Sequence, residues 1–587
     1  MRFSPLHRAS LYLLLAMTAL ALAARGQTTT RLSVNASGVQ GLGNSDYGSI
    51  TADGRFLVFW SEATNLVPGD SNSRDDIFWA DIEAGTIGIA SLAWNQALQA
   101  YGGSVSQVDQ PGISEDGQLV VFSSRASNLV PNDTNNAIDI FVRDISSRTT
   151  ERVSVGVGGA QITGDHSVAP TITADGRYVV FESGNIGLPG GASGGASIYV
   201  HDRLSGTTSR VSWSATGSAT NGDDSAPMVS RGGTAVAYQS TSTDIVLGDT
   251  NAEQDIFVRD LVTNTSIRAS TTSAGVEANN SSFHPSISGD GMRVAFSSLA
   301  TNLVPLDTNN SQDIFLHDRN TGKTTRISAN ASGIEANGFS DFPAISPDGR
   351  YVAFESDADN LVPGDTNGLR DVFLVDTTTS AVERVSVSST GAQAVTGWSC
   401  APSASTGAQQ VVFSSMANNL VPADTNNRRD MFMRETAPLC VGSTTYCTAG
   451  TTASGCQAAL ASCGSASATA TSGFSVIAAN VEAARDGLFF FGASGRQAIP
   501  WGNGTSLQCV VPPVKRGGLL FGVGTAGACD GTFTQDLNAH WCPTCTRPQH
   551  NPGAGAIVQA QLWFRDPWNT SNQSTSMSDA LEFTVGP

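Results

Sequence analysis

Short segments that alternate apolar and polar residues recur along most of the chain. Residues 345–350 (Ile-Ser-Pro-Asp-Gly-Arg), 351–356 (Tyr-Val-Ala-Phe-Glu-Ser) and 371–376 (Asp-Val-Phe-Leu-Val-Asp) have the period of two that predicts β-strands, and residues 383–387 (Glu-Arg-Val-Ser-Val) predict a fourth. The Asp-Gly pair near the end of the first segment is typical of a tight hairpin turn. We therefore expect a unit of four antiparallel strands, named a, b, c and d in chain order.

The unit occurs seven times. Its opening phrase, Ile-Ser/Thr-x-Asp-Gly, begins at residues 50, 113, 172, 287 and 345, and degenerate copies begin at residues 229 and 404. The starting points are about 57 to 63 residues apart, which fits one supersecondary unit per repeat. No comparable amphipathic helix pattern occurs before residue 438. Four-stranded antiparallel units repeated around an axis form a β-propeller, so we predict an all-β, seven-bladed β-propeller.

The order of the strands predicts how the ring closes. A strand d segment precedes every a, b and c strand, and the last unit ends at residues 430–434 without a strand d of its own. The seven strand d segments are expected at residues 31–34, 87–91, 152–155, 210–213, 267–270, 326–329 and 384–387. The N-terminal strand can thus complete the seventh blade. The alternative is six blades and one leftover unit.

Residues 345–354, followed by residues 371–373 (Asp-Val-Phe), resemble the TolB-type, WD-repeat-like propeller family of bacterial envelope proteins. The resemblance extends over roughly residues 30 to 436. The family includes envelope scaffolds, propeller modules attached to serine peptidases, and a branch of pectin-oligomer lyases. The chain departs from the short family repeat in its longer b–c connection, such as residues 360–367 (Asn-Leu-Val-Pro-Gly-Asp-Thr-Asn).

The N-terminus predicts export. Arg2, His7 and Arg8 precede an apolar stretch at residues 11–22, and Ala23 ends an Ala-Leu-Ala site, so residues 1–23 have the pattern of a secretory signal peptide. No second stretch of about 20 apolar residues follows, so we expect no transmembrane segment in the mature chain. The propeller is then expected at residues 28–438 of a periplasmic, cell-surface or secreted protein.

The repeat stops after Pro438, and a cysteine-containing region follows. With Cys400, the nine cysteines are Cys440, Cys447, Cys456, Cys463, Cys509, Cys529, Cys542 and Cys545. In an exported chain such cysteines form disulfides, and an odd number leaves one unpaired. We predict a disulfide-stapled, β-sandwich-like module at residues 439–587, with Cys542 and Cys545 in a disulfide rather than a zinc site. Residues 446–449, 487–492 and 563–567 resemble cysteine-containing C-terminal modules of secreted bacterial surface proteins.

Charge restricts the class of partner. The chain has 51 acidic and 32 basic residues, a net charge of -19, and its only lysines are Lys323 and Lys515. A protein that binds nucleic acid needs a basic surface, and none is visible. We therefore expect an envelope or extracellular protein, or a glycan, as the partner.

The b–c loops form a first set of candidate ligands. Six blades share the spacing Asp-x-Asn-x-x-x-Asp, whereas blade three has residues 188–191 (Leu-Pro-Gly-Gly) instead. Two carboxylates and an amide oxygen begin to meet the needs of Ca²⁺. The alternative is that the first Asp and the Asn make Asx turns and the last Asp caps strand c. The residues are Asp70, Asn72, Asp76, Asp133, Asn135, Asp139, Asp249, Asn251, Asp255, Asp307, Asn309, Asp313, Asp365, Asn367, Asp371, Asp424, Asn426 and Asp430.

The start of strand a, nearest the predicted channel, provides a second set. Here aromatic, acidic and histidine residues differ from blade to blade, a mixture that suits a polar ligand. The candidate channel-mouth residues are Asp46, Tyr47, Asp109, His166, Asp223, Asp224, His284, Asp341 and Trp398.

Two functions follow from these patterns. The first is a non-enzymatic, exported binding or scaffold protein that uses the loop-rich acidic face of the propeller. The alternative, implied by the lyase branch of the family, is a polysaccharide-acting enzyme with a metal or histidine-based site that contains His166 and His284. The nucleophile-elbow pattern at residues 191–195 (Gly-Ala-Ser-Gly-Gly) replaces a b–c loop rather than a strand-to-helix turn, so it predicts a glycine loop and no catalytic serine.

Overall fold

The computed structural model divides the chain into two compact units, of which Gln27–Thr436 is the first. In this unit it describes residues 27–94, 110–191 and 195–436, and beyond it the strands between residues 444 and 584. The predicted signal peptide lies outside the described residues. No helix in the described part of the chain is both long and apolar enough to cross a membrane.

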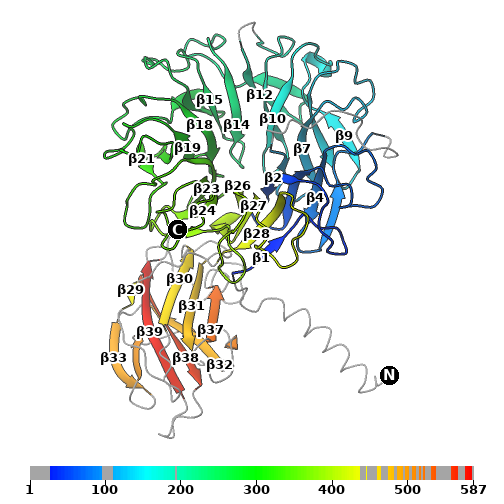
Figure 1. Cartoon of the computed structure of the whole chain (residues 1–587). Helices are drawn as coiled ribbons and strands as arrows, with labels where there is room; N and C mark the ends of the chain where they lie inside the picture. The colour runs from blue at the N-terminus through cyan, green and yellow to red at the C-terminus, as the bar shows by residue number, and fades with distance from the viewer. Residues whose placement is uncertain are drawn as a thin grey trace, which may run out of the picture. The chain divides into compact units, whose positions relative to one another are not determined.

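The first unit is a seven-bladed β-propeller, as predicted (Figure 1). Each blade is one four-stranded antiparallel sheet, and strands a such as β2, β10, β14, β18 and β26 surround the centre. The strands of blades one to three are β2 (Ser45–Ile50), β3 (Phe56–Ser61), β4 (Asp76–Asp81), β5 (Thr86–Ile89), β6 (Gly112–Ile113), β7 (Leu119–Ser124), β8 (Asp139–Asp144), β9 (Thr149–Arg152), β10 (Ser167–Ile172), β11 (Tyr178–Ser183), β12 (Ser197–Asp202) and β13 (Thr207–Arg210).

Blades four to seven repeat this pattern, and only the last takes its outer strand from the N-terminus. Their strands are β14 (Asp224–Val229), β15 (Ala235–Ser240), β16 (Asp255–Asp260), β17 (Thr265–Arg268), β18 (Ser282–Ile287), β19 (Arg293–Ser298), β20 (Asp313–Asp318), β21 (Lys323–Arg326), β22 (Ser340–Ile345), β23 (Tyr351–Ser356), β24 (Asp371–Asp376), β25 (Val382–Arg384), β26 (Ser399–Ala404), β27 (Gln410–Ser415), β28 (Asp430–Glu435) and β1 (Thr29–Arg31).

The N-terminal strand closes the ring, which confirms the predicted closure and excludes the six-bladed alternative. β1 pairs antiparallel with β28, so that Thr30 lies opposite Met433. Side chains reinforce the pairing: Ser33 Oγ donates to the Asp430 carboxylate at 2.5 Å, and the guanidinium of Arg31 lies 3.4 Å from the same carboxylate. The last blade is therefore completed by residues from the opposite end of the unit.

Strands d begin one to three residues earlier than predicted in all seven blades. The segment predicted at residues 152–155 follows β9, which ends at Arg152. The reason is the buried Ser154, whose hydroxyl donates to Asp139 and accepts the N–H of Ile140. A side chain thus replaces the backbone pairing that the alternating pattern suggested. The closing strand is shifted in the same way, to Thr29–Arg31 instead of residues 31–34.

The core lies both within and between the blades. In every blade an aromatic ring from strand b packs on one from strand c, as Phe59 does on Phe78 with ring centroids 5.7 Å apart. The cluster around Phe59 also contains Val412 and Met431 of blade seven. Since neighbouring blades share their apolar contacts, an open ring would expose the facing surfaces of blades one and seven.

The second unit is also all-β. Its strands are β29 (Thr444–Thr445), β30 (Ala459–Gly464), β31 (Phe474–Val481), β32 (Asp486–Gly492), β33 (Arg496–Trp501), β34 (Ser506–Val510), β35 (Lys515–Arg516), β36 (Leu520–Phe521), β37 (Gly531–Asp536), β38 (Ile557–Arg565) and β39 (Thr575–Thr584). One sheet has the order β29-β39-β38-β32-β35, with β36 also on β32; β30-β31-β37 and β33-β34 form two more. The cysteine side chains of this unit, and hence the predicted disulfides, lie outside the described residues.

Closure by β1 can be tested with one matched pair of variants. Ser33 and Ser154 hold equivalent buried carboxylates, but only Ser33 belongs to the closing segment. We expect Ser33→Ala and Ser154→Ala each to lower the free energy of unfolding by about 1–3 kcal/mol, because a buried hydrogen bond is lost. Only Ser33→Ala should also speed proteolytic cleavage of residues 27–34. Equal cleavage rates in the two variants would contradict the closing role of this segment.

Candidate functional site

The Asp-x-Asn-x-x-x-Asp loops form Asx turns. In blade two the side-chain oxygen of Asn135 accepts the N–H of Ala137 at 3.1 Å, and its amide group donates to Asp139 at 2.8 Å. Asp133 accepts the backbone N–H of Asn135. The same asparagine turn occurs in all six loops, at Asn72, Asn135, Asn251, Asn309, Asn367 and Asn426.

An arginine from strand d lies between the two carboxylates in five of these loops. Arg152 Nη1 is 3.3 Å from Asp133 and 3.4 Å from Asp139, and Arg268 is 3.0 Å from Asp249 and 3.1 Å from Asp255. Arg31, Arg326 and Arg384 occupy the equivalent positions. The guanidinium neutralises the carboxylates, so these five loops do not fit a calcium ion. Among the described residues, no group of three or more acidic, histidine or cysteine side chains could hold a metal.

Blade one differs because Ile89 stands at the arginine position, so its loop at Asp70, Asn72 and Asp76 is where the calcium prediction and the Asx-turn alternative can be told apart. We expect millimolar Ca²⁺ to leave the melting temperature of chelator-treated protein unchanged. A ligand that binds only the folded state would raise it by mass action. A rise that Asp70→Asn abolishes would contradict this expectation and would place calcium in blade one.

Asp224, one of the predicted channel-mouth residues, belongs to a buried network instead. Its carboxylate accepts hydrogen bonds from Ser240 at 2.6 Å and Thr220 at 2.7 Å and lies 3.8 Å from Arg210. Burial raises the pKa of Asp224. Blade three has Ser197 where the other strands c begin with aspartate, and Asp224 stands where most strands a begin with serine. In blade three the carboxylate that faces Arg210 therefore comes from Asp224 of the neighbouring blade four, and not from the first residue of strand c.

This exchange predicts a rescue. Asp224→Ser leaves the guanidinium of Arg210, whose side chain is only 2% exposed, without its nearest carboxylate. The variant should lose about 3–5 kcal/mol of unfolding free energy, because an uncompensated buried charge is costly. Adding Ser197→Asp restores the arrangement of the other blades and should recover at least half of the loss in denaturant unfolding. No recovery would mean that Asp224 stabilises the fold in another way.

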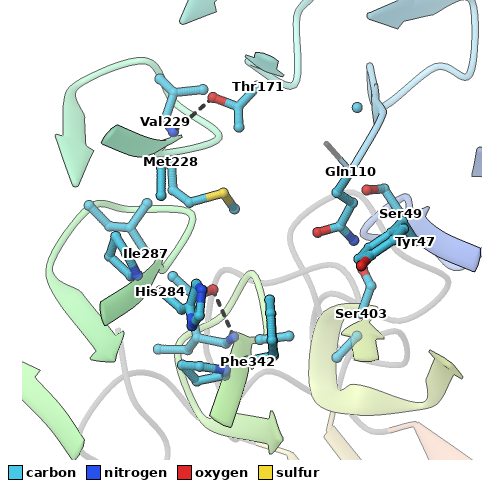
Figure 2. A pocket seen from close by; sticks show the side chains of 18 of the residues that line it. Tyr47, Ser49, Gln110, Thr171, Met228, Val229, His284, Ile287, Phe342 and Ser403 are labelled. Atoms are coloured by element: carbon cyan, nitrogen blue, oxygen red, sulfur yellow. Dashed lines mark hydrogen bonds between the residues drawn. The ribbon is translucent and has the colours of Figure 1, made fainter. Parts of the chain in front are cut away.

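The channel is lined by strands a of all seven blades. They enclose a cavity of about 290 Å³, which Figure 2 shows from close by. One mouth residue per blade comes from the same position: Tyr47, Gln110, Ala169, Ala226, His284, Phe342 and Ala401. All except Gln110 have φ between 47° and 51°. The shift in strand register there is a β-bulge, which commonly re-aims a side chain.

The large mouth residues face one another across the opening (Figure 2). On one side the ring of His284 stacks on Phe342, with centroids 4.1 Å apart, and its Nδ1 is 2.8 Å from the Asp341 carboxylate. On the other side Gln110 donates from Nε2 to Gly48 O at 2.7 Å. Burial, assisted by the charge of Asp46, raises the pKa of Tyr47 to about 12, so its phenol stays neutral. When the imidazole is neutral and donates from Nδ1 to Asp341, its Nε2 is an acceptor.

Two arginines lie next to the mouth residues, and each is paired with a carboxylate. Arg429 pairs with Asp46 and lies over Trp398 at 4.1 Å, and Arg370 donates to Glu355 at 2.8 Å. The free thiol of Cys400 is buried beside them, and burial raises its pKa. The sequence-based prediction included Asp46 and Trp398 but missed both arginines. The residue directly before each strand c changes from blade to blade, and that variation is the signal that could have found Arg370 and Arg429.

Two other predicted mouth residues, His166 and Asp223, lie apart from the cavity. Nδ1 of His166 accepts the N–H of Ile138 at 2.9 Å, and Nε2 is 3.1 Å from Arg125. His166 does not line the cavity, so the structure does not bring it together with His284. Asp223 accepts the N–H of Ala196 at 3.0 Å. Asp109 lies outside the described residues.

The a–b turns surround the end of the channel opposite the Tyr47 mouth, and hydrogen bonds between blades narrow that end. Arg231 of blade four pairs with Glu115 of blade two, and Glu115 also accepts the N–H of Asp53 at 3.2 Å. The a–b turns are joined around the axis by backbone bonds from Glu115 to Ala174 (2.9 Å), Ala174 to Arg231 (3.0 Å), Gly289 to Pro347 (2.8 Å) and Thr406 to Ala52 (2.8 Å). A ligand would therefore approach from the Tyr47 end.

Comparisons with known proteins assign neither a family nor a function. No family model and no curated protein matches the sequence. Similar solved structures include an oligogalacturonate lyase from Vibrio parahaemolyticus (10% identity, 70% of this chain, 93% of that chain, TM-score 0.40) and the β-propeller domain of the Trilobed protease from Pyrococcus furiosus (12%, 67%, 94%, 0.41). A putative TolB from Agrobacterium tumefaciens is 15% identical over 56% of this chain and 89% of its own, with a TM-score of 0.30. At these identities and TM-scores the likeness says nothing of function.

Proposed function

We propose that the protein is an exported, non-enzymatic binding protein that takes a protein or glycan partner at the mouth of its propeller channel. One observation carries the proposal: Tyr47 Oη, Gln110 Oε1 and His284 Nε2 have no hydrogen-bond partner among the described residues, and all three residues line one cavity. A concave site with a few convergent polar groups is the usual form of a ligand site.

The scaffold favours binding because the mouth is held rigidly. Each bulge residue belongs to a strand that pairs with strand b of its own blade, and several also bond to the preceding blade. The N–H of His284 donates to Gln239 Oε1 at 2.9 Å, and that of Ala401 donates to Glu355 at 3.1 Å. Side chains held in this way lose little conformational freedom when a ligand binds. Residues 1–23 as a leader and residues 439–587 as a disulfide-stapled attachment module complete the proposal.

A second candidate is a polysaccharide-acting enzyme, favoured by the hydrogen bond between His284 and Asp341. A carboxylate that holds Nδ1–H orients the imidazole, and Nε2 could then accept a proton from a bound substrate. The sequence-based version of this candidate paired His284 with His166, which lies away from the cavity. An enzyme would need a second catalytic residue beside His284, whereas a binding protein would not. We therefore prefer the binding function.

The proposal predicts which variants lose binding. On arrays of glycans and purified envelope proteins, the wild-type chain should bind at least one ligand class, and Tyr47→Ala/His284→Ala should bind it at least tenfold more weakly. His166→Ala is the matched control and should bind as the wild type does, because His166 lies off the cavity.

Two outcomes would overturn the proposal. The first is binding that survives the double variant. The second is cleavage of a polysaccharide by the wild type that His284→Ala abolishes, which would establish the enzyme instead. Thermal unfolding of each variant checks that the propeller remains folded.

A further inference from the structure

The mouth offers hydrogen-bonding groups of mixed character. Gln110 Oε1 accepts, and His284 Nε2 accepts when the neutral imidazole donates from Nδ1 to Asp341, whereas the neutral hydroxyl of Tyr47 both donates and accepts. A ligand that satisfies all three must itself carry several groups that can act as donor or acceptor. Hydroxyl groups on adjacent carbons have this property, which carboxylates and ammonium groups lack.

The mouth also offers ring faces. The stacked pair of His284 and Phe342 lies across the opening from Tyr47 (Figure 2). Phe342 is 37% exposed, although most large apolar residues of the propeller are buried. Ring faces beside polar atoms that have no partner among the described residues suit a molecule with a flat C–H face and polar edges, such as a pyranose ring.

Charge argues against an acidic ligand. Arg231 and His284 are the only basic residues that line the described cavity, and Arg231 is paired with Glu115. Behind the mouth, Arg429 is paired with Asp46, and Arg370 with Glu355 and Asp357. The undescribed segments within the propeller, residues 95–109 and 192–194, contain no lysine or arginine. A bound carboxylate would therefore find no unpaired guanidinium or ammonium group among the described residues that line the cavity, and burying it without one would be costly.

Charge argues equally against a cationic ligand. The carboxylates nearest the mouth are already engaged: Asp46 by Arg429, and Asp341 by His284 and by the N–H of Phe342 at 2.8 Å. A cation would have to displace these partners.

The size and shape of the cavity restrict how much of a polymeric ligand can enter the channel. About 290 Å³ is at the small end of ligand sites, which hold roughly 300–1,000 Å³. The inner end is narrowed by the bonds between the a–b turns and by the pair of Arg231 and Glu115. A polymer can thus insert its end but cannot pass through the propeller.

From these observations we infer that the channel mouth binds the terminal residue of an uncharged glycan, with Tyr47, Gln110 and His284 as its hydrogen-bonding residues and Phe342 as a stacking surface. This inference rests on the proposed function and specifies its ligand class. It excludes uronic acids and phosphorylated sugars as preferred ligands.

Calorimetric titration of the full mature chain tests the inference. The neutral probes are the methyl glycosides of glucose, galactose, mannose and N-acetylglucosamine, and the anionic probes are the methyl glycosides of glucuronate and galacturonate. We expect at least one neutral probe to bind with a millimolar dissociation constant and the uronates to bind at least tenfold more weakly.

Two variants of the mouth residues locate the site. Tyr47→Phe removes only the hydroxyl, and we expect it to weaken binding of the neutral probe about tenfold. His284→Ala should do the same. Tyr178→Phe is the matched control, because Tyr178 lies under Arg177 outside the channel and its hydroxyl does not face the cavity. It should bind the probe as the wild type does.

The outcomes separate this inference from the proposed function. A uronate that binds as tightly as every neutral probe, or neutral binding that Tyr47→Phe leaves unchanged, overturns the inference. If no sugar binds but a protein partner binds and is lost in Tyr47→Ala/His284→Ala, the ligand class is wrong and the proposed function stands. If the double variant affects neither sugars nor proteins, both are wrong.

Discussion

The pairing of β1 with β28 is the constraint on which the rest of the structure depends. Neighbouring blades share their apolar contacts, and the N-terminal strand completes the last sheet where blades one and seven meet. The channel mouth crosses this junction, since Tyr47 belongs to blade one and Ala401 to blade seven. A ring that opened there would separate the residues of the proposed site.

A repeated buried network holds each outer strand to its blade. An aspartate at the start of strand c accepts a hydrogen bond from a serine that follows strand d, as Asp371 does from Ser386 at 2.5 Å. An arginine two residues before that serine neutralises the carboxylates of the b–c loop. In the seventh blade Arg31 and Ser33 take these roles, so the network that recurs in blades two, four, five and six also fastens the ring. Replacing any one residue of this network destabilises the propeller, because the replacement leaves a buried polar group without its partner.

The sequence predicted the blades well because their information is local and repeated. Strand alternation, the Asp-Gly turns and the count of strand d segments were sufficient for seven blades and for the closure. The exact strands d were misplaced because Ser154 and its equivalents use side chains where alternation suggested backbone pairing. Periodicity says nothing of which buried polar atom bonds to which.

The site was predicted less completely for a related reason. Tyr47 and His284 were found because strand a differs from blade to blade at its start. Asp224 and His166 share that variability but bond to neighbouring loops, and only the folded chain separates them from the mouth. The positive φ of the mouth residues is a property of bulges, five of which precede a proline, and no pattern of polarity reveals it. The Ca²⁺ loops were ambiguous because the arginine that neutralises them comes from a strand about twenty residues away.

Hydrogen–deuterium exchange of the peptide that covers residues 27–34 tests the central claim most directly. The N–H of Leu32 donates to Met431 O at 2.7 Å, so the closing segment should open only when the seventh blade opens. The account predicts that this peptide exchanges as slowly as the one that covers β28. Exchange at the rate of a frayed terminus, with β28 still protected, would contradict closure by β1.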